Sequence, residues 1–160
     1  MEVAFRKINP FGQLLILLVV LVIMLGAKYH SGLSLSALRD VARQNDLRRI
    51  SAALQLYADD HSRWPATTGW SKSNEGGDFL VELKNQGYLK EVPLDPLNND
   101  IFYYRYQSIV AGQYGCLTDG YVLQSVRLEN TSGALGNGRC FDMDWLATAP
   151  IGLTFFGTGK

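Results

Sequence analysis

The amino-terminal part of the sequence contains one long stretch without a charged side chain. Between Lys7 and Lys28 lie 20 consecutive uncharged residues, and residues 14–25 are all aliphatic or methionine. A helix rises about 1.5 Å per residue, so a stretch of this length reaches roughly 30 Å, the thickness of the hydrocarbon layer of a bilayer. A helix also satisfies its own backbone groups, as lipid requires. The stretch therefore predicts a transmembrane helix over residues 10–28, preceded by a short segment of residues 1–9.

The charges that flank this stretch predict its orientation. Arg6 and Lys7 precede it, so the positive-inside rule places the amino terminus in the cytoplasm and the residues after about Ala27 outside. The chain is then a single-pass membrane protein with an extracytoplasmic carboxyl-terminal domain. A cleaved signal peptide is the alternative, since the apolar core also fits a signal sequence and residues 25–27 (Leu-Gly-Ala) form a tolerable cleavage site.

The charge balance limits what the remaining residues do. The chain has 15 Lys and Arg against 15 Asp and Glu, and removing residues 1–27 leaves 13 basic and 14 acidic residues, a balance of −1. A general nucleic-acid binder would normally carry a basic excess, so no nucleic acid is expected as a partner. With 47% hydrophobic residues, the chain is not a disordered one.

An amphipathic helix is predicted to follow within residues 29–65, after a break near Gly32. Its apolar stripe starts near Ser36 and consists of Leu38, Val41, Ala42, Leu47, Ile50, Ala53, Leu54 and Tyr57. The charged residues between them are expected to form a solvated face of alternating sign rather than a basic interaction patch; they are Arg39, Asp40, Arg43, Asp46, Arg48, Arg49, Asp59 and Asp60. Asp46 can pair with Arg43 or Arg49 at helical spacing. Pro65 ends the helix, because the residue before a proline is pushed out of the helical region.

Residues 66–160 are predicted to form loops and a β-sheet. A helical turn at residues 79–83 ends at Gly87 as a left-handed cap, and the prolines of residues 92–96 exclude regular structure there. Strands are predicted over residues 101–106, 114–117 and 121–128, with a loop at 129–138. The order indicates the α+β class, with a long helix packed on a small antiparallel sheet. The tyrosines of these strands are expected to cover the sheet rather than to form a binding platform.

Cys116 and Cys140 are the only cysteines, and both lie in the part of the chain placed outside the cytoplasm. An even count there suggests a disulfide, which would close a loop of about 24 residues and contribute about 3 kcal/mol. A free buried pair of thiols is the alternative. A metal site is disfavoured, because the two histidines, His30 and His61, are distant in sequence and no CxxC motif occurs.

Residues 43–106 carry a pattern of motifs that resembles the type II secretion pseudopilins and type IV pilins, the major pseudopilin above all. The most specific run is GYLKEVPLDP at residues 87–96. The residues that match the family motifs are Asp46, Leu54, Tyr57, Pro65, Gly87, Tyr88, Pro93, Asp95 and Pro96.

The resemblance implies a pilin-like fold and the role of a structural filament subunit. Its partners would be copies of itself in a helical filament, other pilin-like subunits and an inner-membrane assembly platform for pilus assembly or protein secretion. The apolar helix would supply the assembly surface, through Leu14, Leu15, Leu18, Val22 and Leu25. The cysteine pair would be similar to the disulfide that closes the carboxyl-terminal region of type IV pilins.

The amino terminus departs from the family pattern. The family's leader ends in glycine before Phe or Met, whereas here Pro10 precedes Phe11 and Gly12 precedes Gln13. The family's early glutamate is also absent, since no acidic residue lies between Lys7 and Asp40. The alternative is therefore an uncleaved, membrane-anchored pilin-like binding module that presents its extracytoplasmic domain to a partner.

The resemblance to major pseudopilins also implies calcium in a carboxyl-terminal loop. Oxygen ligands for calcium could come from Asp119, Asp142 and Asp144, and separately from Asp95, Asn98, Asn99 and Asp100. Turn and capping roles are favoured for these residues, with Asp95 shaping the proline loop. No cofactor is otherwise expected. No nucleophile, P-loop or HExxH motif occurs, so the chain is not expected to be an enzyme.

Overall fold

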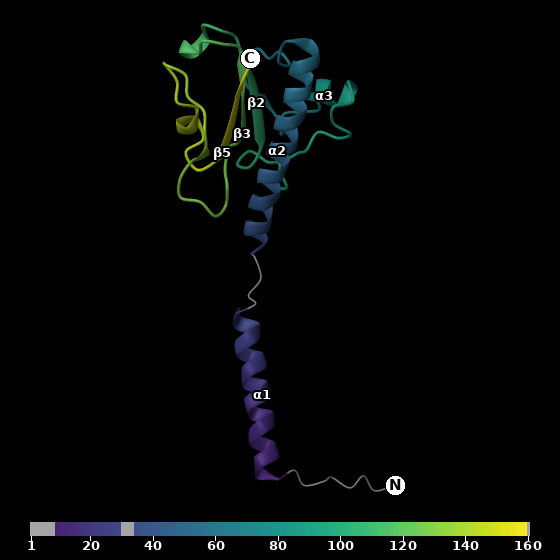
Figure 1. Ribbon diagram of the computed structural model, residues 1–160, viewed down its shortest axis with the longest axis vertical. Coiled ribbons are helices and arrows are strands. Elements are labelled where there is room, and N and C mark those ends of the chain that lie inside the picture. The colour runs from purple at the N-terminus through teal and green to yellow at the C-terminus, as the bar shows by residue number, and fades with distance from the viewer. Residues whose placement is uncertain (1–8, 30–33, 160) are drawn as a thin grey trace. The chain divides into compact units, whose positions relative to one another are not determined.

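The structure is a computed structural model that describes residues 9–29 and 34–159 (Figure 1). The chain divides into two compact units, residues 1–34 and residues 35–160, and each is described by itself. The predictions that concern residues 1–8, His30 and the break near Gly32 lie outside the described residues.

The first unit contains one helix, α1 (Pro10–Tyr29). Asn9 caps it, because its Oδ1 accepts a hydrogen bond of 2.7 Å from the backbone N–H of Gly12. Pro10 suits the first helical position, since its missing N–H would have no partner there. Within the described residues, no helix combines the length and the apolar content that crossing a membrane requires.

The second unit begins with a 27-residue helix, α2 (Leu35–His61). Its carboxyl-terminal half follows the predicted stripe, and its buried apolar residues are Leu47, Ile50, Ala53, Leu54 and Tyr57. The helix ends before Pro65, as predicted, and Ser62 leaves it with a positive φ of 55°.

The prediction is wrong for the first turns of α2. Leu38 and Val41 are 48% and 49% exposed, whereas Asp40 and Arg43 are buried at 8% and 0%. The helix is therefore rotated so that charged residues face the domain in its first half. The physical reason is that loops distant in sequence supply charged partners for them, as described below.

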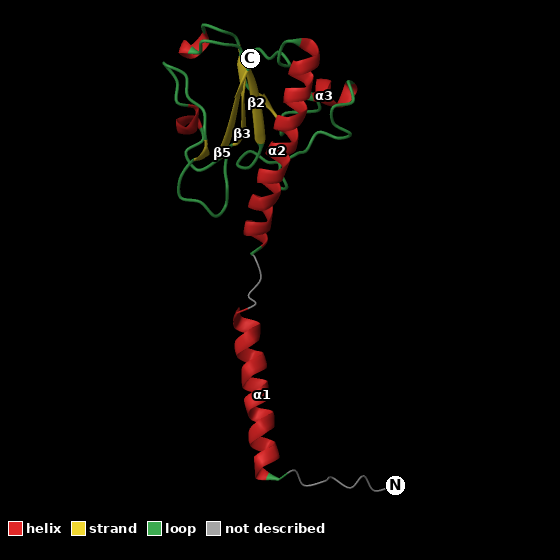
Figure 2. Cartoon of the chain, viewed as in Figure 1, coloured by secondary structure: helices red, strands yellow, loops and turns green. Residues whose placement is uncertain are grey.

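A five-stranded sheet packs against α2, which establishes the α+β class (Figure 2). Its strands are β1 (Ser71–Lys72), β2 (Tyr104–Ile109), β3 (Gly120–Ser125), β4 (Leu135–Gly136) and β5 (Leu153–Thr158). The spatial order is β1-β2-β3-β5-β4, with every pair antiparallel except β4 and β5.

Three strand predictions differ from the structure. The first strand starts at Tyr104 rather than at 101, because the side chain of Asn99 accepts the N–H groups of Ile101 and Phe102 and holds a turn there. Residues 113–115 form a 3-10 turn instead of a strand, with Tyr114 at a φ of 53°. β3 ends at Ser125 rather than at 128.

Three strands were not predicted. β1 (Ser71–Lys72) lies before the first predicted strand, in a segment expected to be a loop. β4 lies inside the predicted loop at 129–138, and β5 lies near the carboxyl terminus. Gly157 weakens the strand pattern of β5, yet a glycine is needed there, since a Cβ at this position would overlap the ring of Tyr121 on β3.

Both faces of the sheet are covered. On one face, Tyr104, Tyr106, Tyr121 and Leu123 join the apolar residues of α2 in the main core. Alternate residues point to the other face, where Val122 joins a smaller core that contains Trp145 and the two cysteines. The short helix α3 (Val81–Asn85) closes the first core, and Gly87, with a φ of 83°, caps it as predicted.

Candidate functional site

The predicted assembly residues lie along α1. The side chains of Leu14, Leu15, Leu18 and Val22 are all more than half exposed within their unit. Every other large apolar side chain from Phe11 to Met24 is exposed as well. The side chain of Leu25 lies outside the described residues.

A buried ionic cluster holds the first half of α2 to the domain. Its centre is Arg43, whose side chain is completely buried. The guanidinium donates two hydrogen bonds to Asp95, from Nε to Oδ2 at 2.7 Å and from Nη2 to Oδ1 at 3.1 Å. Its Nη1 donates to Asp40 at 2.8 Å and to Glu129 at 2.7 Å. Arg43 thus forms ion pairs with three carboxylates from three segments of the chain.

Arg39 and Asp40 complete this cluster. Arg39 donates to both carboxylate oxygens of Glu129, at 2.7 and 2.5 Å. Asp40 accepts from the backbone N–H groups of Glu129 and Asn130 and from the side-chain amide of Asn130. The loop that follows β3 is therefore fixed to α2 through both its backbone and its side chains.

The protonation of the cluster follows from these contacts. The hydrogen bond from Arg39, aided by Arg43, lowers the pKa of Glu129 to about 2. Burial by itself would raise the pKa of Asp40, but the hydrogen bonds from Glu129, Asn130 and Arg43 outweigh it and lower that pKa. Arg43 has a raised pKa, since its bonds to Asp95 and Glu129 outweigh the effect of burial. Glu129, Asp40 and Arg43 are thus charged at neutral pH.

The sequence prediction of a solvated charged face is wrong for this cluster. Asp40 and Arg43 stand three residues apart, and Arg43 stands four before Leu47, so both occupy the register of the buried face. A pair of charges in that register was the signal available in the sequence. The partners, Asp95 and Glu129, could not be found by spacing, because they lie 52 and 86 residues from Arg43.

Asp95 has the role predicted for it and a second one. Its Oδ1 accepts the backbone N–H of Leu97 at 2.9 Å and so shapes the proline loop. The same carboxylate, on a residue only 3% exposed, pairs with Arg43. Of the two prolines that flank it, Pro93 is half-buried and Pro96 is exposed.

Asp46 also occupies the helix–sheet interface. Its Oδ2 accepts the hydroxyl of Tyr104 at 3.0 Å, and its Oδ1 lies 3.7 Å from Arg49 Nη1, one of the two pairings predicted. Burial raises the pKa of Asp46, partly opposed by Tyr104 and Arg49.

The other motif residues support the far end of α2. The Tyr57 ring packs edge-on against Tyr88, with centroids 5.6 Å apart, and its hydroxyl donates to Glu82. Burial and the bond to Glu82 raise the pKa of Tyr57 to about 12. The carbonyl of Pro65 accepts the hydroxyl of Tyr106, while Leu54 is fully buried. These motif residues make intramolecular contacts that build the domain.

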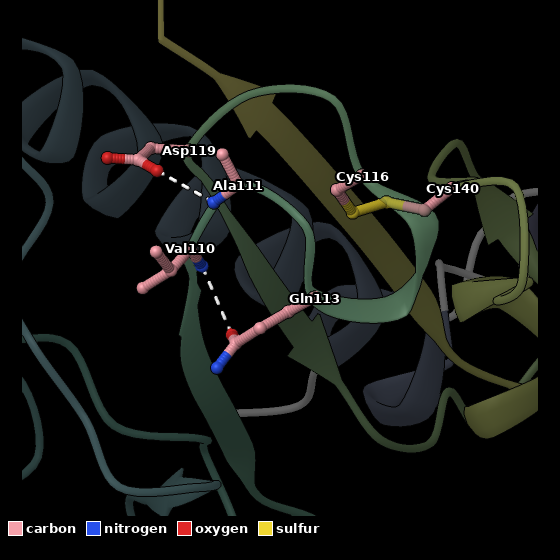
Figure 3. The surroundings of a disulfide bond; sticks show 6 residues. All are labelled: Val110, Ala111, Gln113, Cys116, Asp119 and Cys140. Atoms are coloured by element: carbon pink, nitrogen blue, oxygen red, sulfur yellow. Dashed lines mark hydrogen bonds between the residues drawn. A yellow bond between two sulfur atoms is a disulfide. The ribbon is translucent and has the colours of Figure 1, made fainter.

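The predicted disulfide between Cys116 and Cys140 is present, with a Cα–Cα distance of 4.8 Å (Figure 3). Nearby, Ala111 donates its backbone N–H to Asp119 Oδ1 at 2.8 Å. The residue that follows each cysteine projects outward, since Leu117 and Phe141 are both 94% exposed. Nothing in the sequence predicted a role for these two residues.

The calcium candidates do not form a ligand cluster. Among the described residues, no three His, Cys, Asp or Glu gather in a way that could hold a metal ion. Asp144 caps the 3-10 turn η2 (Trp145–Thr148) and pairs with Arg139, and Asp119 is bonded as above, whereas Asp142 is exposed.

The second set of calcium candidates is engaged in turns as well. Asn98 exchanges hydrogen bonds with Ser73, and Asn99 accepts two backbone N–H groups. Asp100 accepts from the side chain of Asn74. The turn and capping roles favoured by the sequence are thus observed.

Comparison with protein-family models, with curated proteins and with solved structures found no match to this chain.

Proposed function

We propose that this chain is a pilin-like structural subunit of a type IV pilus-like or type II secretion pseudopilus-like filament, anchored and assembled through α1. The observation that carries the proposal is the apolar surface of that helix. Its large apolar side chains from Phe11 to Met24 are exposed within their own unit. Exposing an apolar surface of this length to water is unfavourable, so a lipid or protein partner is expected to cover it.

The uncharged stretch of the sequence is longer than the part of it whose side chains the structure describes. The uncharged stretch runs from Ile8 to Ala27, which is long enough for a helix to span a bilayer. In lipid, such a helix associates with its neighbours by close side-chain packing, since the bilayer offers no hydrophobic drive between helices.

The second unit has the architecture that the resemblance predicts for a filament subunit of this kind. A long helix lies against a sheet that is antiparallel except for the pairing of β4 with β5, and a disulfide joins Cys116 to Cys140. The resemblance rests on motif residues that include Tyr57, Tyr88 and Asp95. Tyr57 packs against Tyr88 at the core, and Asp95 accepts hydrogen bonds from Arg43 in the ionic cluster.

A second candidate function is a membrane-anchored binding module that is never cleaved or polymerised. The absence of an acidic residue between Lys7 and Asp40 favours it, because a filament of the known type uses an early glutamate to pair with the neighbouring amino terminus. Both functions share the anchor and differ in what contacts α1.

Site-specific photo-crosslinking in cells that make the full chain distinguishes the two. A benzophenone amino acid at Leu18 is expected to give a ladder of dimers and larger multimers of this chain, since the neighbours of α1 in a filament are other copies of α1. Leu94 is a matched control position, because it is also 51% exposed but lies on a loop of the domain.

The outcomes separate the hypotheses. Monomer alone at Leu18, in chain recovered from the membrane fraction, would contradict the filament proposal and support the single anchor. Sequencing the amino terminus of the mature chain adds an independent test. A start at Phe11 or Gln13 supports pilin-type processing, a start at Met1 supports the uncleaved anchor, and a start at Lys28 would refute both.

A further inference from the structure

One edge of the sheet is open along part of β5. In the antiparallel pairing of β3 with β5, Gly159 donates its N–H to Asp119, so the residues of β5 that bond to β3 are those with odd numbers. The backbone groups of Thr154, Phe156 and Thr158 therefore point to the opposite edge.

β4 covers only the beginning of this edge. It pairs with Leu153 and Thr154, and the carbonyl of Thr154 accepts the N–H of Asn137. Within residues 34–159, no hydrogen bond uses the backbone groups of Phe156 or Thr158 on this side. An open edge of this kind is a template for another extended backbone.

An apolar depression of about 730 Å³ lies beside this open edge. Phe156 and Thr158 line it together with the disulfide, which lies next to β5 (Figure 3). Leu117 and Phe141 also line it, and each directly follows one of the bonded cysteines. The disulfide thus sets the spacing of two projecting apolar side chains at the rim of the depression.

We propose that this edge binds an extended peptide segment of a partner protein, which adds a strand to β5 beside Phe156 and Thr158. The N–H and C=O groups of the edge would pair with the peptide backbone. Because side chains alternate along a strand, every second residue of the peptide would point toward the disulfide, and these residues would be apolar to contact Leu117 and Phe141.

The chemistry of the site favours this occupant. Among the described residues that line the depression, Arg139 is the only charged one, and it already pairs with Asp144 at 2.8 Å. The occupant therefore needs no charge of its own. The open part of the edge is also short, since of residues 34–159 only Phe156 and Thr158 present unbonded backbone groups there, so a single short strand is enough to cover it. The proposal is independent of whether α1 assembles into a filament.

The test measures binding of synthetic peptides to the purified full chain by fluorescence anisotropy. The probes are fluorescein-labelled peptides Thr-X-Thr-X-Thr-X-Thr, with X as Leu, Val, Phe or Ser. Binding is expected for the apolar X residues, and the serine peptide should bind at least tenfold more weakly. Two matched peptides carry N-methyl groups on alternate residues, one peptide along one hydrogen-bonding edge and the other along the opposite edge. The peptide whose methylated edge faces β5 should fail to bind.

Variants locate the site without disturbing the core. Leu117→Ser and Phe141→Ser should each weaken binding about tenfold, and both side chains are too exposed for the fold to depend on them. Thr158→Pro removes an N–H that points away from β3, so it should weaken binding several-fold, while Thr158→Ala should change it less than twofold. Circular dichroism of each variant checks that the domain is folded.

Three results would overturn the proposal. The first is that no apolar peptide binds at 1 mM. The second is equal binding of both N-methylated peptides, which would mean that the depression takes apolar groups without strand pairing. The third is self-association of the full chain that Leu117→Ser and Phe141→Ser abolish, which would make a second copy the occupant. Slowed hydrogen exchange of the Phe156 and Thr158 amides on peptide binding would support it directly.

Discussion

Replacing Arg43 by methionine is expected to destabilise the domain of residues 35–159 by about 3–5 kcal/mol. The methionine keeps the apolar stem of the side chain, so the cavity that it leaves is small. The cost comes from the carboxylates, because Asp95 is 3% exposed and loses both bonds to Arg43, the one cation that pairs with it among the described residues. Removing one partner of a buried ion pair typically costs this amount, since the remaining charge is buried without water or a counter-ion.

The contacts that the carboxylates keep in the Arg43→Met variant limit the loss of stability. Glu129 keeps Arg39, and Asp40 keeps the N–H groups of Glu129 and Asn130. Asp95 keeps only the N–H groups of its own loop, such as that of Leu97, so it bears most of the loss. Adding Asp95→Asn to the Arg43→Met variant removes the isolated charge and should recover about half of the loss. The two substitutions should therefore show a coupling of at least about 2 kcal/mol in a double-mutant cycle, since any loss caused by Asp95→Asn alone adds to it.

Urea unfolding followed by tryptophan fluorescence measures these values. The three tryptophans, Trp64, Trp70 and Trp145, all lie in the second unit and report on it alone. Arg49→Met is the matched control, because the side chain of Arg49 is 61% exposed and its ion pair is long; its effect should stay within about 0.5 kcal/mol. A loss below 1 kcal/mol for Arg43→Met, or no coupling with Asp95→Asn, would refute the assignment of Arg43 as the centre of the cluster.

Three further predictions concern the same unfolding measurement. Gly157→Ala should cost about 1–3 kcal/mol, since its Cβ would overlap the ring of Tyr121, whereas Gly133→Ala, with open space around it, should cost little; equal effects would contradict the packing described. Replacing Cys116 and Cys140 by serine should cost about 3 kcal/mol, and an unchanged urea midpoint would argue against a stabilising disulfide. Because the pKa of Glu129 is lowered from 4.5 to about 2, its stabilising effect is complete above pH 4.5 and is lost as the pH falls toward 2. Glu129→Gln should therefore flatten the pH dependence of stability in that window, and an identical profile in both proteins would exclude this role.

The sequence predicted those elements whose signals are local. The carboxyl-terminal half of α2, the cap at Gly87 and the turn at Asp95 each depend on residues a few positions apart. The disulfide was predicted because only one pairing was available. For the helix, the cap and the turn, the local residue choices agree with the fold of the whole domain.

The elements that were missed depend on distant partners. β4 is two residues long and exists because β5 lies beside it, and β5 is interrupted by a glycine that the ring of Tyr121 requires. The burial of Arg43 depends on carboxylates more than 50 residues away. The exposed pair Leu117 and Phe141 is likewise visible only once the disulfide has brought their loops together. No periodicity within a single segment carries this information.

The ionic cluster also gives the domain a mechanical property. Tension that reaches the domain at the start of α2 is borne by the bond of Ser36 to Asn130 and by the ionic contacts of Arg39, Asp40 and Arg43. Charge-assisted hydrogen bonds are short and directional, so they weaken steeply once donor and acceptor are pulled out of line. The domain should therefore resist an axial pull stiffly at first and then yield in a single step, when the first turns of α2 peel away from the loops of Asp95 and Glu129.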